Sequence, residues 1–300
     1  MSLTVVGSVA YDAVETPEAK IDRALGGSAV YFAAAASLLI PVNLVGVVGE
    51  DFDRSEIEFL RARGVDLSGL TSEKGRTFFW KGRYLADMNE RETLDTQLNV
   101  FESFDPVLPE SYRTSPYLFL ANIHPQLQLN VIRQSRGTRF VAMDTMNYWI
   151  NGTLPQLRET LAAVDGLLIN DSEARLLSGE NSLFRGIEKI QKMGPRIVIV
   201  KKGEHGAILK HEGELFICPA YPVEQLFDPT GAGDTFAGGF MGYLARAGGI
   251  NRASVRRAML YGTALASLCV ETFSVERLRG ADLADVEQRV ERLSRMMALD

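Results

Sequence analysis

The residues of this chain best suited to chemistry are two aspartates separated by small residues. Residues 228–234 read Asp-Pro-Thr-Gly-Ala-Gly-Asp, and an apolar stretch typical of a helix follows them. A backbone this bare at the start of a helix can bring several N–H groups to an anion, and the helix dipole adds to the attraction. A carboxylate at Asp234 would repel that anion. Its presence therefore indicates a proton acceptor for a hydroxyl that attacks a phosphoryl group.

This segment resembles the C-terminal signature of the ribokinase-like, PfkB-type carbohydrate and nucleoside kinases, whose core pattern is Asp-Thr-x-Gly-Ala-Gly-Asp. Pro229 departs from the commonest form of that pattern. The resemblance implies that Asp234 is the catalytic base. It also implies an anion hole for the γ-phosphate of ATP, formed by the backbone N–H groups of Gly231, Ala232 and Gly233. The residues alone leave one alternative open, a glycine-rich turn before a core helix.

Length, charge and cysteine content limit the classes of protein to which this chain can belong. Its 300 residues suffice for one large α/β domain, and 46% hydrophobic residues can form a sizeable core. A net charge of −6 argues against a nucleic-acid partner. The two cysteines, Cys218 and Cys269, lack CxxC spacing and are interpreted as reduced core thiols. The three histidines show no spacing typical of metal ligands.

An uncharged stretch, residues 24–49, is long enough to raise the question of a membrane span. Pro41 and Asn43 interrupt it, and we interpret it as a buried helix over residues 28–40 followed by a buried strand over residues 42–48. The chain enters an apolar strand almost at once and shows no basic region there, so no signal peptide is predicted. We therefore expect a cytoplasmic protein without a membrane partner.

Short apolar runs alternate with helix-length segments along most of the chain. This alternation predicts right-handed βαβ units and a mainly parallel central sheet with helices on both faces. Residues 207–210 and 214–217 indicate an antiparallel hairpin, and residues 231–298 are predicted to be mostly helical. The predicted buried strands are residues 3–9, 42–48, 117–121, 139–143, 166–169 and 196–200, and the predicted helices are residues 52–63, 126–136, 154–163 and 182–193.

Two insertions, at about residues 11–25 and 75–101, break this rhythm with weakly alternating, strand-like sequence. The resemblance implies that they build a small β-sheet lid over the sugar site, and surface loops are the alternative. We expect an α/β protein with a ribokinase-like three-layer α/β/α fold, formed by a single domain over residues 1–300. Exposed apolar faces of the lid strands would favour a homodimer through the lid.

Residues that bind the acceptor are expected in the first insertion and just after it. The resemblance implies that Asp12 holds two sugar hydroxyls, and that Gly26 and Gly27 lie close to the sugar and let the lid hinge. Four residues after Gly27 the family pattern has an asparagine, whereas this chain has Tyr31. Together with Phe79 of the second insertion, Tyr31 would give the acceptor site an aromatic wall. A structural role of these aromatic residues is the alternative.

Residues that bind the nucleotide are expected after the later strands of the sheet. Asn170 and Glu173 match the family's Asn-x-x-Glu motif. The match implies water-mediated contacts with Mg²⁺ that arrives with ATP, and an ordinary helix N-cap is the alternative. Gly203 and Gly206 resemble the family's Gly-x-x-Gly turn beneath the nucleotide.

Thr230 and Ala264 complete the expected nucleotide site. In relatives, the helix that corresponds to the one around Ala264 flanks the adenine. The segment equivalent to residues 228–230 often lies near a monovalent cation such as K⁺. Lys201 and Lys202 could reach phosphates, although lysines at the end of a strand are usually just solvated.

The residues and the resemblance together predict an ATP-dependent kinase that phosphorylates a primary hydroxyl of a nucleoside or a sugar. The aromatic residues favour a nucleoside, and a ribose-like or fructose-like sugar is the first alternative. A non-catalytic nucleotide- or sugar-binding sensor on the same fold is the second. A dinucleotide-dependent dehydrogenase is disfavoured, because residues 231–236 do not form GxGxxG and lie late in the chain.

Overall fold

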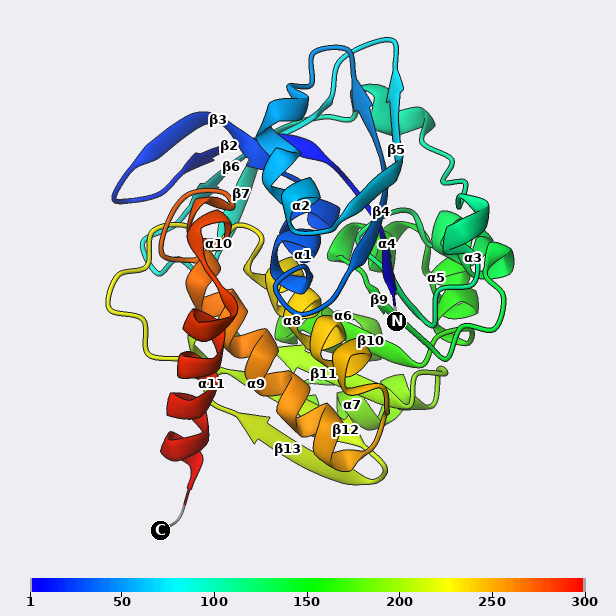
Figure 1. The fold of residues 1–300 in the computed structure, drawn as a ribbon. Coiled ribbons are helices and arrows are strands. Elements are labelled where there is room, and N and C mark those ends of the chain that lie inside the picture. Colours follow the sequence, from blue (N-terminus) through cyan, green and yellow to red (C-terminus); the bar gives the residue numbers. More distant parts are fainter. Residues whose placement is uncertain (1, 299–300) are drawn as a thin grey trace.

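A nine-stranded sheet forms the centre of the computed structural model, which describes residues 2–298. The strands lie in the order β13-β12-β11-β10-β9-β8-β1-β4-β5 (Figure 1) and pair in parallel, except that β12 is antiparallel to both of its neighbours. The predicted α/β class and the predicted hairpin are confirmed. The strands are β1 (Leu3–Val6), β4 (Val42–Gly49), β5 (Asp66–Glu73), β8 (Tyr117–Leu120), β9 (Phe140–Asp144), β10 (Gly166–Asn170), β11 (Ile197–Lys201), β12 (Ala207–His211) and β13 (Glu214–Cys218).

Helices cover both faces of this sheet, and each face has its own hydrophobic core. Alternate strand residues supply the two cores: Ile197 and Ile199 belong to one, and Val198 and Val200 to the other. The first core is covered by α1 (Ser28–Ala36), α2 (Glu58–Ala62), α8 (Ala232–Ala247), α9 (Arg252–Cys269), α10 (Glu276–Gly280) and α11 (Leu283–Met297). The second is covered by α3 (Pro125–Gln134), α4 (Asn147–Gly152), α5 (Leu154–Leu161), α6 (Asp171–Ser178) and α7 (Leu183–Gln191).

A separate four-stranded sheet, which we call the lid, lies to one side of the central sheet at the left of Figure 1. Its order is β3-β2-β6-β7, from β2 (Ala10–Glu15), β3 (Lys20–Gly26), β6 (Phe78–Tyr84) and β7 (Arg91–Gln97). Strand β2 follows β1 after a short connection. The lid therefore begins at the carboxyl edge of the parallel strands, where open α/β sheets bind their ligands.

The predicted helix over residues 52–63 forms as two shorter pieces. A 3-10 helix over Arg54–Ile57 precedes α2, and the Asp53 side chain accepts a hydrogen bond from the Ser55 N–H at its start. A side chain that satisfies a free N–H at this point competes with the regular α-helical pattern. The expectation of one continuous helix was wrong.

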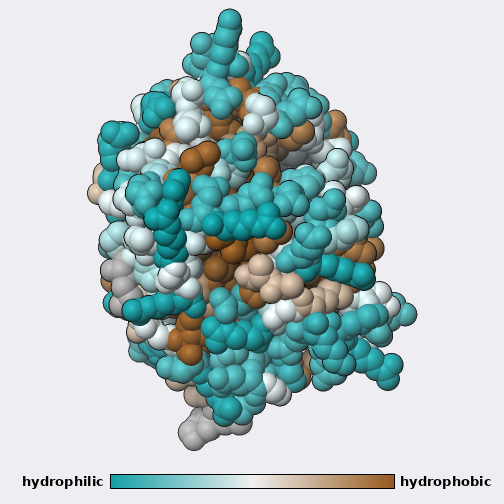
Figure 2. Space-filling view, turned by 90° about the vertical axis from the view of Figure 1, so that its right-hand side faces the viewer, coloured by the Kyte–Doolittle hydropathy of each residue, from teal (hydrophilic) through white to brown (hydrophobic). Residues whose placement is uncertain are grey.

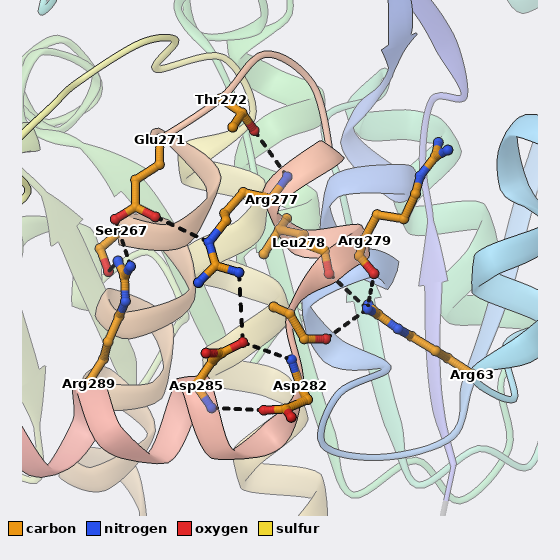
Figure 3. Close-up of polar contacts among 11 residues, drawn as sticks. Arg63, Ser267, Glu271, Thr272, Arg277, Leu278, Arg279, Asp282, Asp285 and Arg289 are labelled. Atoms are coloured by element: carbon orange, nitrogen blue, oxygen red, sulfur yellow. Dashed lines mark hydrogen bonds and ion pairs between the residues drawn. The ribbon is translucent and has the colours of Figure 1, made fainter.

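The C-terminal helices are fastened to the rest of the fold by arginine side chains (Figure 3). Arg63 Nη2 donates to the carbonyl oxygens of Leu278, Arg279 and Ala281 at 2.9, 2.7 and 2.9 Å. These carbonyls lie at the end of α10, where a helix has no partners of its own for them. A single side chain before β5 therefore caps a helix more than two hundred residues away.

A second group in Figure 3 centres on Glu271, which follows α9. Arg289 Nη2 and Arg277 Nε contact its two carboxylate oxygens at 2.6 and 3.4 Å. The neighbouring Val270 carbonyl accepts hydrogen bonds from the N–H groups of Phe227 and Asp228 at 2.8 and 3.3 Å. The arginines on α10 and α11 thus hold the loop that in turn holds Asp228.

The surface is largely polar. Figure 2 shows a face covered mainly by hydrophilic side chains, with smaller hydrophobic areas between them. Within residues 2–298, no helix is both long enough and apolar enough to cross a membrane.

Candidate active site

Asp234 lies in the first turn of α8, directly after a left-handed residue. Gly231 is the N-cap of this helix with φ 74°, a conformation that glycine adopts without strain. Residues 231–234 are each half-buried, so the start of the helix remains accessible to solvent. Burial raises the pKa of the Asp234 carboxyl above 3.8; the charge of Asp144 adds to the rise, and Lys201 and Arg91 oppose it. This arrangement places a carboxylate beside the N–H groups of Gly231 and Gly233. The Ala232 N–H, which the sequence assigned to the same anion hole, instead donates to the Pro229 carbonyl oxygen at 3.1 Å.

A second carboxylate, Asp12 on β2, lies nearby and is almost fully buried. Gly26 on β3 packs against it so closely that a Cβ on Gly26 would lie 2.0 Å from Asp12 Oδ2. Gly27 follows β3 with φ 97°, and its N–H lowers the pKa of the same carboxyl. Burial, followed by the charges of Asp228 and Asp234, raises the pKa of Asp12 to about 7. The two glycines thus leave room for the carboxylate that the sequence assigned to the acceptor.

A second pair of charged groups, Asp144 and Lys201, acts on the pKa of Asp234. Asp144 ends β9 and Lys201 ends β11, and Lys201 Nζ lies 3.5 Å from Asp144 Oδ2. A Cβ on Gly233 would lie 2.8 Å from the same Nζ, so the ammonium stands directly against the start of α8. The side chain of Lys201 is only 17% exposed, unlike the solvated lysine that the sequence led us to expect. A cation in this position can neutralise an anion bound at the helix N-terminus.

Asn170 and Glu173 form a complete capping box at the start of α6. Asn170 Oδ1 accepts from the Glu173 N–H at 2.8 Å, and Glu173 Oε2 accepts from the Asn170 N–H at 2.9 Å. The helix-cap interpretation of this motif is therefore realised. Burial and the charge of Asp144 raise the pKa of Glu173, and Lys201 and Arg91 lower it. The cap uses only one of the two carboxylate oxygens, so the geometry leaves the other available to a metal shell.

The face of the lid that carries Asp12 also carries Trp80, Tyr84 and Arg91. Asp12 and Trp80 are partners in the β2–β6 pairing, and Tyr84 pairs with Arg91 across β6 and β7. Thr230 Oγ1 donates to the Tyr84 hydroxyl at 3.2 Å, which joins this face of the lid to the loop before α8. The lid thus presents an indole, a phenol and a guanidinium to the site.

Residues 2–278 match the model of the pfkB family carbohydrate kinases. The chain belongs to the PfkB family. It is therefore a phosphotransferase whose acceptor is an alcohol group, and the resemblance seen in the sequence is confirmed.

Similar proteins cover nearly the whole of this PfkB-family chain. The cytidine kinase of Thermococcus kodakarensis is 27% identical over 253 residues, which are 82% of this chain and 89% of the relative. The ATP-dependent ribose-1-phosphate kinase of Halopiger xanaduensis is 30% identical over 270 residues, 87% of this chain and 84% of the relative. The crystal structure of the Methanocaldococcus jannaschii nucleoside kinase gives a TM-score of 0.78 at 22% identity and covers 97% of this chain and 98% of that one. These matches support a nucleoside or sugar kinase of the ribokinase family.

Tyr31 does not form an open aromatic wall in this PfkB-family structure. It is 2% exposed, and its ring covers Gly231 so closely that a Cβ there would lie 2.3 Å from the ring carbons. The tyrosine thus packs beneath the backbone that presents the N–H groups. Its position on the buried helix α1 explains the difference, because all residues of α1 are buried.

Phe79 also differs from the expectation, because it lies on the other face of the lid. It pairs with Tyr11, whose ring centre lies 5.6 Å from that of Phe52 at a tilt of 36° and whose hydroxyl donates to Glu56. Successive strand residues point to opposite faces, so Trp80 rather than Phe79 shares the face of Asp12. The ring of the adjacent Phe78 stacks on the ring of Phe101, with 5.2 Å between the ring centres, and so contributes to packing.

Two of the expected nucleotide residues lie at a turn after β11, where Gly203 is exposed and Gly206 is buried, and a third lies in α9. Gly203 and Gly206 have positive φ values of 54° and 77° around a 3-10 turn after β11. Ala264 is fully buried between α8 and α9, so the expected contact of its side chain with the nucleotide does not fit this structure. The small side chain instead permits close packing of these helices.

Asp228 has an unusual environment for a carboxylate. Its Oδ1 accepts from the Thr230 N–H at 2.8 Å, whereas Oδ2 is buried and has no hydrogen-bond partner among the described residues. Burial raises the pKa of Asp228 to about 6. An unpartnered buried carboxylate oxygen is costly unless a cation or water binds it. No group of three or more histidine, cysteine, aspartate or glutamate side chains arranged to hold a metal occurs within residues 2–298.

Sequence reasoning did not assign Asp144 or Arg91 to the site and gave Lys201 little weight. Asp144 and Lys201 each stand at the carboxyl end of a predicted parallel strand, and that shared edge was the available signal. Arg91 begins a lid strand that resembled many other polar segments, so nothing in its sequence context pointed to the site.

Proposed function

We propose that this protein transfers the γ-phosphoryl group of ATP to a primary hydroxyl of a nucleoside. The observation that carries the proposal is the position of Asp234 in the first turn of α8, next to Gly233, against which the Lys201 ammonium stands. A base, an anion site and, in Asp12, a carboxylate for the acceptor are the groups that phosphoryl transfer requires.

The chemical step follows from these residues. The acceptor hydroxyl oxygen forms a bond with the γ-phosphorus while the bond from that phosphorus to the bridging oxygen breaks, and the electron pair leaves on ADP. The hydroxyl proton passes to the Asp234 carboxylate. The N–H groups of Gly231 and Gly233 and the ammonium of Lys201 stabilise the charge on the phosphoryl oxygens.

Mg²⁺ bound with ATP would supply charge neutralisation at the β- and γ-phosphates. Glu173 fits the outer shell of such an ion, because its second carboxylate oxygen is not used by the helix cap, and Asn170 orients the same segment. We further assign a monovalent cation such as K⁺ to the unpartnered Oδ2 of Asp228. Its charge would remove the penalty of burying that carboxylate.

The preference for a nucleoside rests on Trp80, which faces the site from the same side as Asp12 and can stack on a base. The similarity to a cytidine kinase supports the same choice. A free or phosphorylated pentose is the second candidate, because Tyr31 and Phe79 pack elsewhere, and a 30% identical relative is a ribose-1-phosphate kinase.

The test is a panel of nucleosides, free pentoses and hexoses, and pentose phosphates, scored by ADP release with Mg²⁺ and ATP. We expect a nucleoside to give the highest kcat/KM. Asp234→Asn should lower kcat by at least two orders of magnitude while ATP still binds. Turnover with sugars alone would reject the nucleoside assignment. A wild-type protein that binds nucleotide but turns over no acceptor would indicate the sensor.

A further inference from the structure

Arg91 is a charged group of the site to which the proposed mechanism gives no role. It is the first residue of lid strand β7 and is exposed. It pairs with Tyr84, whose hydroxyl accepts from Thr230 just before α8, so the arginine stands close to the helix start that carries Asp234. Its charge lowers the pKa values of four carboxyls, Asp12, Asp144, Glu173 and Asp234.

The guanidinium is held by aromatic groups of the lid rather than by a carboxylate. Arg91 Cζ lies 5.5 Å from the centre of the Trp80 ring, and Arg91 pairs with Tyr84 across β6 and β7. Within residues 2–298 Arg91 forms no ion pair, whereas Arg83 of the same hairpin bonds Glu15 at 3.1 Å. A planar guanidinium without an ionic partner retains donors for a phosphoryl group.

Two contacts of residues that precede Arg91 fix the lid hairpin against the main body. Tyr84 accepts from Thr230 in the loop before α8. At the hairpin turn, Asn89 Nδ2 donates to Glu204 Oε1 at 3.3 Å, beside the Gly203 turn. Since residues 84 and 89 are both anchored, the start of β7 has a defined position above the site. The lid that covers the acceptor therefore also reaches the nucleotide turn.

We propose that Arg91 is a catalytic residue that contacts the oxygens of the γ-phosphoryl group as it moves from ATP to the acceptor. This inference rests on the proposed phosphotransferase function. Arg91 would supply a positive charge from the lid, opposite the positive charge that Lys201 supplies from the central sheet. The transferred group would lie between Lys201 and Arg91, and both charges would grow in importance as the bridging bond breaks.

The variants Arg91→Ala and Arg91→Lys test the proposal, with Arg83→Ala as the matched control. Arg83 lies on the same hairpin in an exposed ion pair and should change little. For Arg91→Ala we expect kcat to fall by roughly 10²-fold or more, with a much smaller change in the KM of the acceptor. Guanidinium ion added to Arg91→Ala should restore part of kcat, and the lysine variant should retain an intermediate rate.

A binding measurement separates this inference from the proposed function. Calorimetry should show that wild type binds a non-hydrolysable ATP analogue more tightly than ADP, and that Arg91→Ala loses roughly tenfold of this ratio. If wild type turns over no acceptor but the ratio still depends on Arg91, the proposed function fails and the phosphate contact stands. An unchanged ratio, or a loss confined to the KM of an anionic acceptor, would overturn the inference.

Discussion

Gly231→Ala tests whether Tyr31 supports the anion site from below. The substitution places a methyl group on a residue with φ 74° and against a ring whose carbons would lie 2.3 Å from the new atom. Two separate costs therefore combine, the left-handed backbone and the overlap with Tyr31. The first arises at any alanine with this backbone, and the second depends on the tyrosine.

The magnitude can be worked from these two costs. A left-handed alanine costs about 1–2 kcal/mol, and overpacking adds roughly 1–3 kcal/mol. With an unfolding entropy of about 2.1 cal/mol/K per residue, 3 kcal/mol over 300 residues corresponds to a fall in Tm of roughly 5 °C. Gly137→Ala is the matched control, because Gly137 has φ 69° and no atom within 4 Å of the new Cβ.

The assay is thermal and denaturant unfolding of Gly231→Ala, Gly137→Ala and wild type, with kinase turnover on the same samples. We expect the first variant to lose more stability than the second and to lose about 10²-fold in kcat, because the N–H groups shift. In a Tyr31→Ala background, the same glycine substitution should cost about 1–3 kcal/mol less. Equal costs at Gly231 and Gly137, or in both backgrounds, would refute the reasoning.

Three further predictions follow from buried charges. Asp12→Asn should raise the free energy of unfolding by up to about 4 kcal/mol at pH 8, since the wild-type carboxyl has a pKa of about 7 when folded and the ordinary pKa of 3.8 when unfolded. Between pH 4 and 7 the folded wild type binds more protons than the unfolded chain, so the stability gain of Asp12→Asn over wild type should shrink as pH falls from 7 to 4. A gain that does not change with pH in denaturant unfolding would contradict this. Arg63→Ala should lower stability by about 3 kcal/mol, because three carbonyls lose their donor; a loss below about 1 kcal/mol in denaturant unfolding would show that water replaces it. Wild-type turnover should rise when KCl replaces tetramethylammonium chloride, and Asp228→Asn should abolish this rise. An equal rise in the wild type and the variant would reject the assignment of the cation to Asp228 Oδ2.

Much of the main sheet could be predicted because its strands are buried on both faces. Residues 197–200 are a continuous apolar run, and such a run between turn signals has few other solutions. Strand β5 was not predicted, because it lies at the edge of the sheet and most of its residues are exposed. An edge strand is held by hydrogen bonds to a single neighbouring strand and needs fewer buried apolar residues. The apolar pattern that identifies a strand in the sequence is therefore weaker.

The site divides in the same way between local and distant signals. Asp234 and Gly231 could be predicted because one continuous segment contains both the carboxylate and the bare helix start. Lys201 and Arg91 could not, because they approach Asp234 only through the order of the strands and the closure of the lid. The assignment of Phe79 instead of Trp80 shows how a shift of one residue along a strand changes the face.

The charge balance of the site links the lid to the base. Four carboxylates face two cations, of which Lys201 belongs to the central sheet and Arg91 to the lid. Arg91 lowers the pKa of Asp234, so withdrawal of the lid would raise that pKa further and favour the protonated, inactive acid. By linkage, deprotonation of Asp234 must in turn favour the closed lid. Asp234 would then be most ready to accept a proton when the lid covers the acceptor. With the lid withdrawn, phosphoryl transfer to water would be disfavoured both because Asp234 is protonated and because the Arg91 charge is absent.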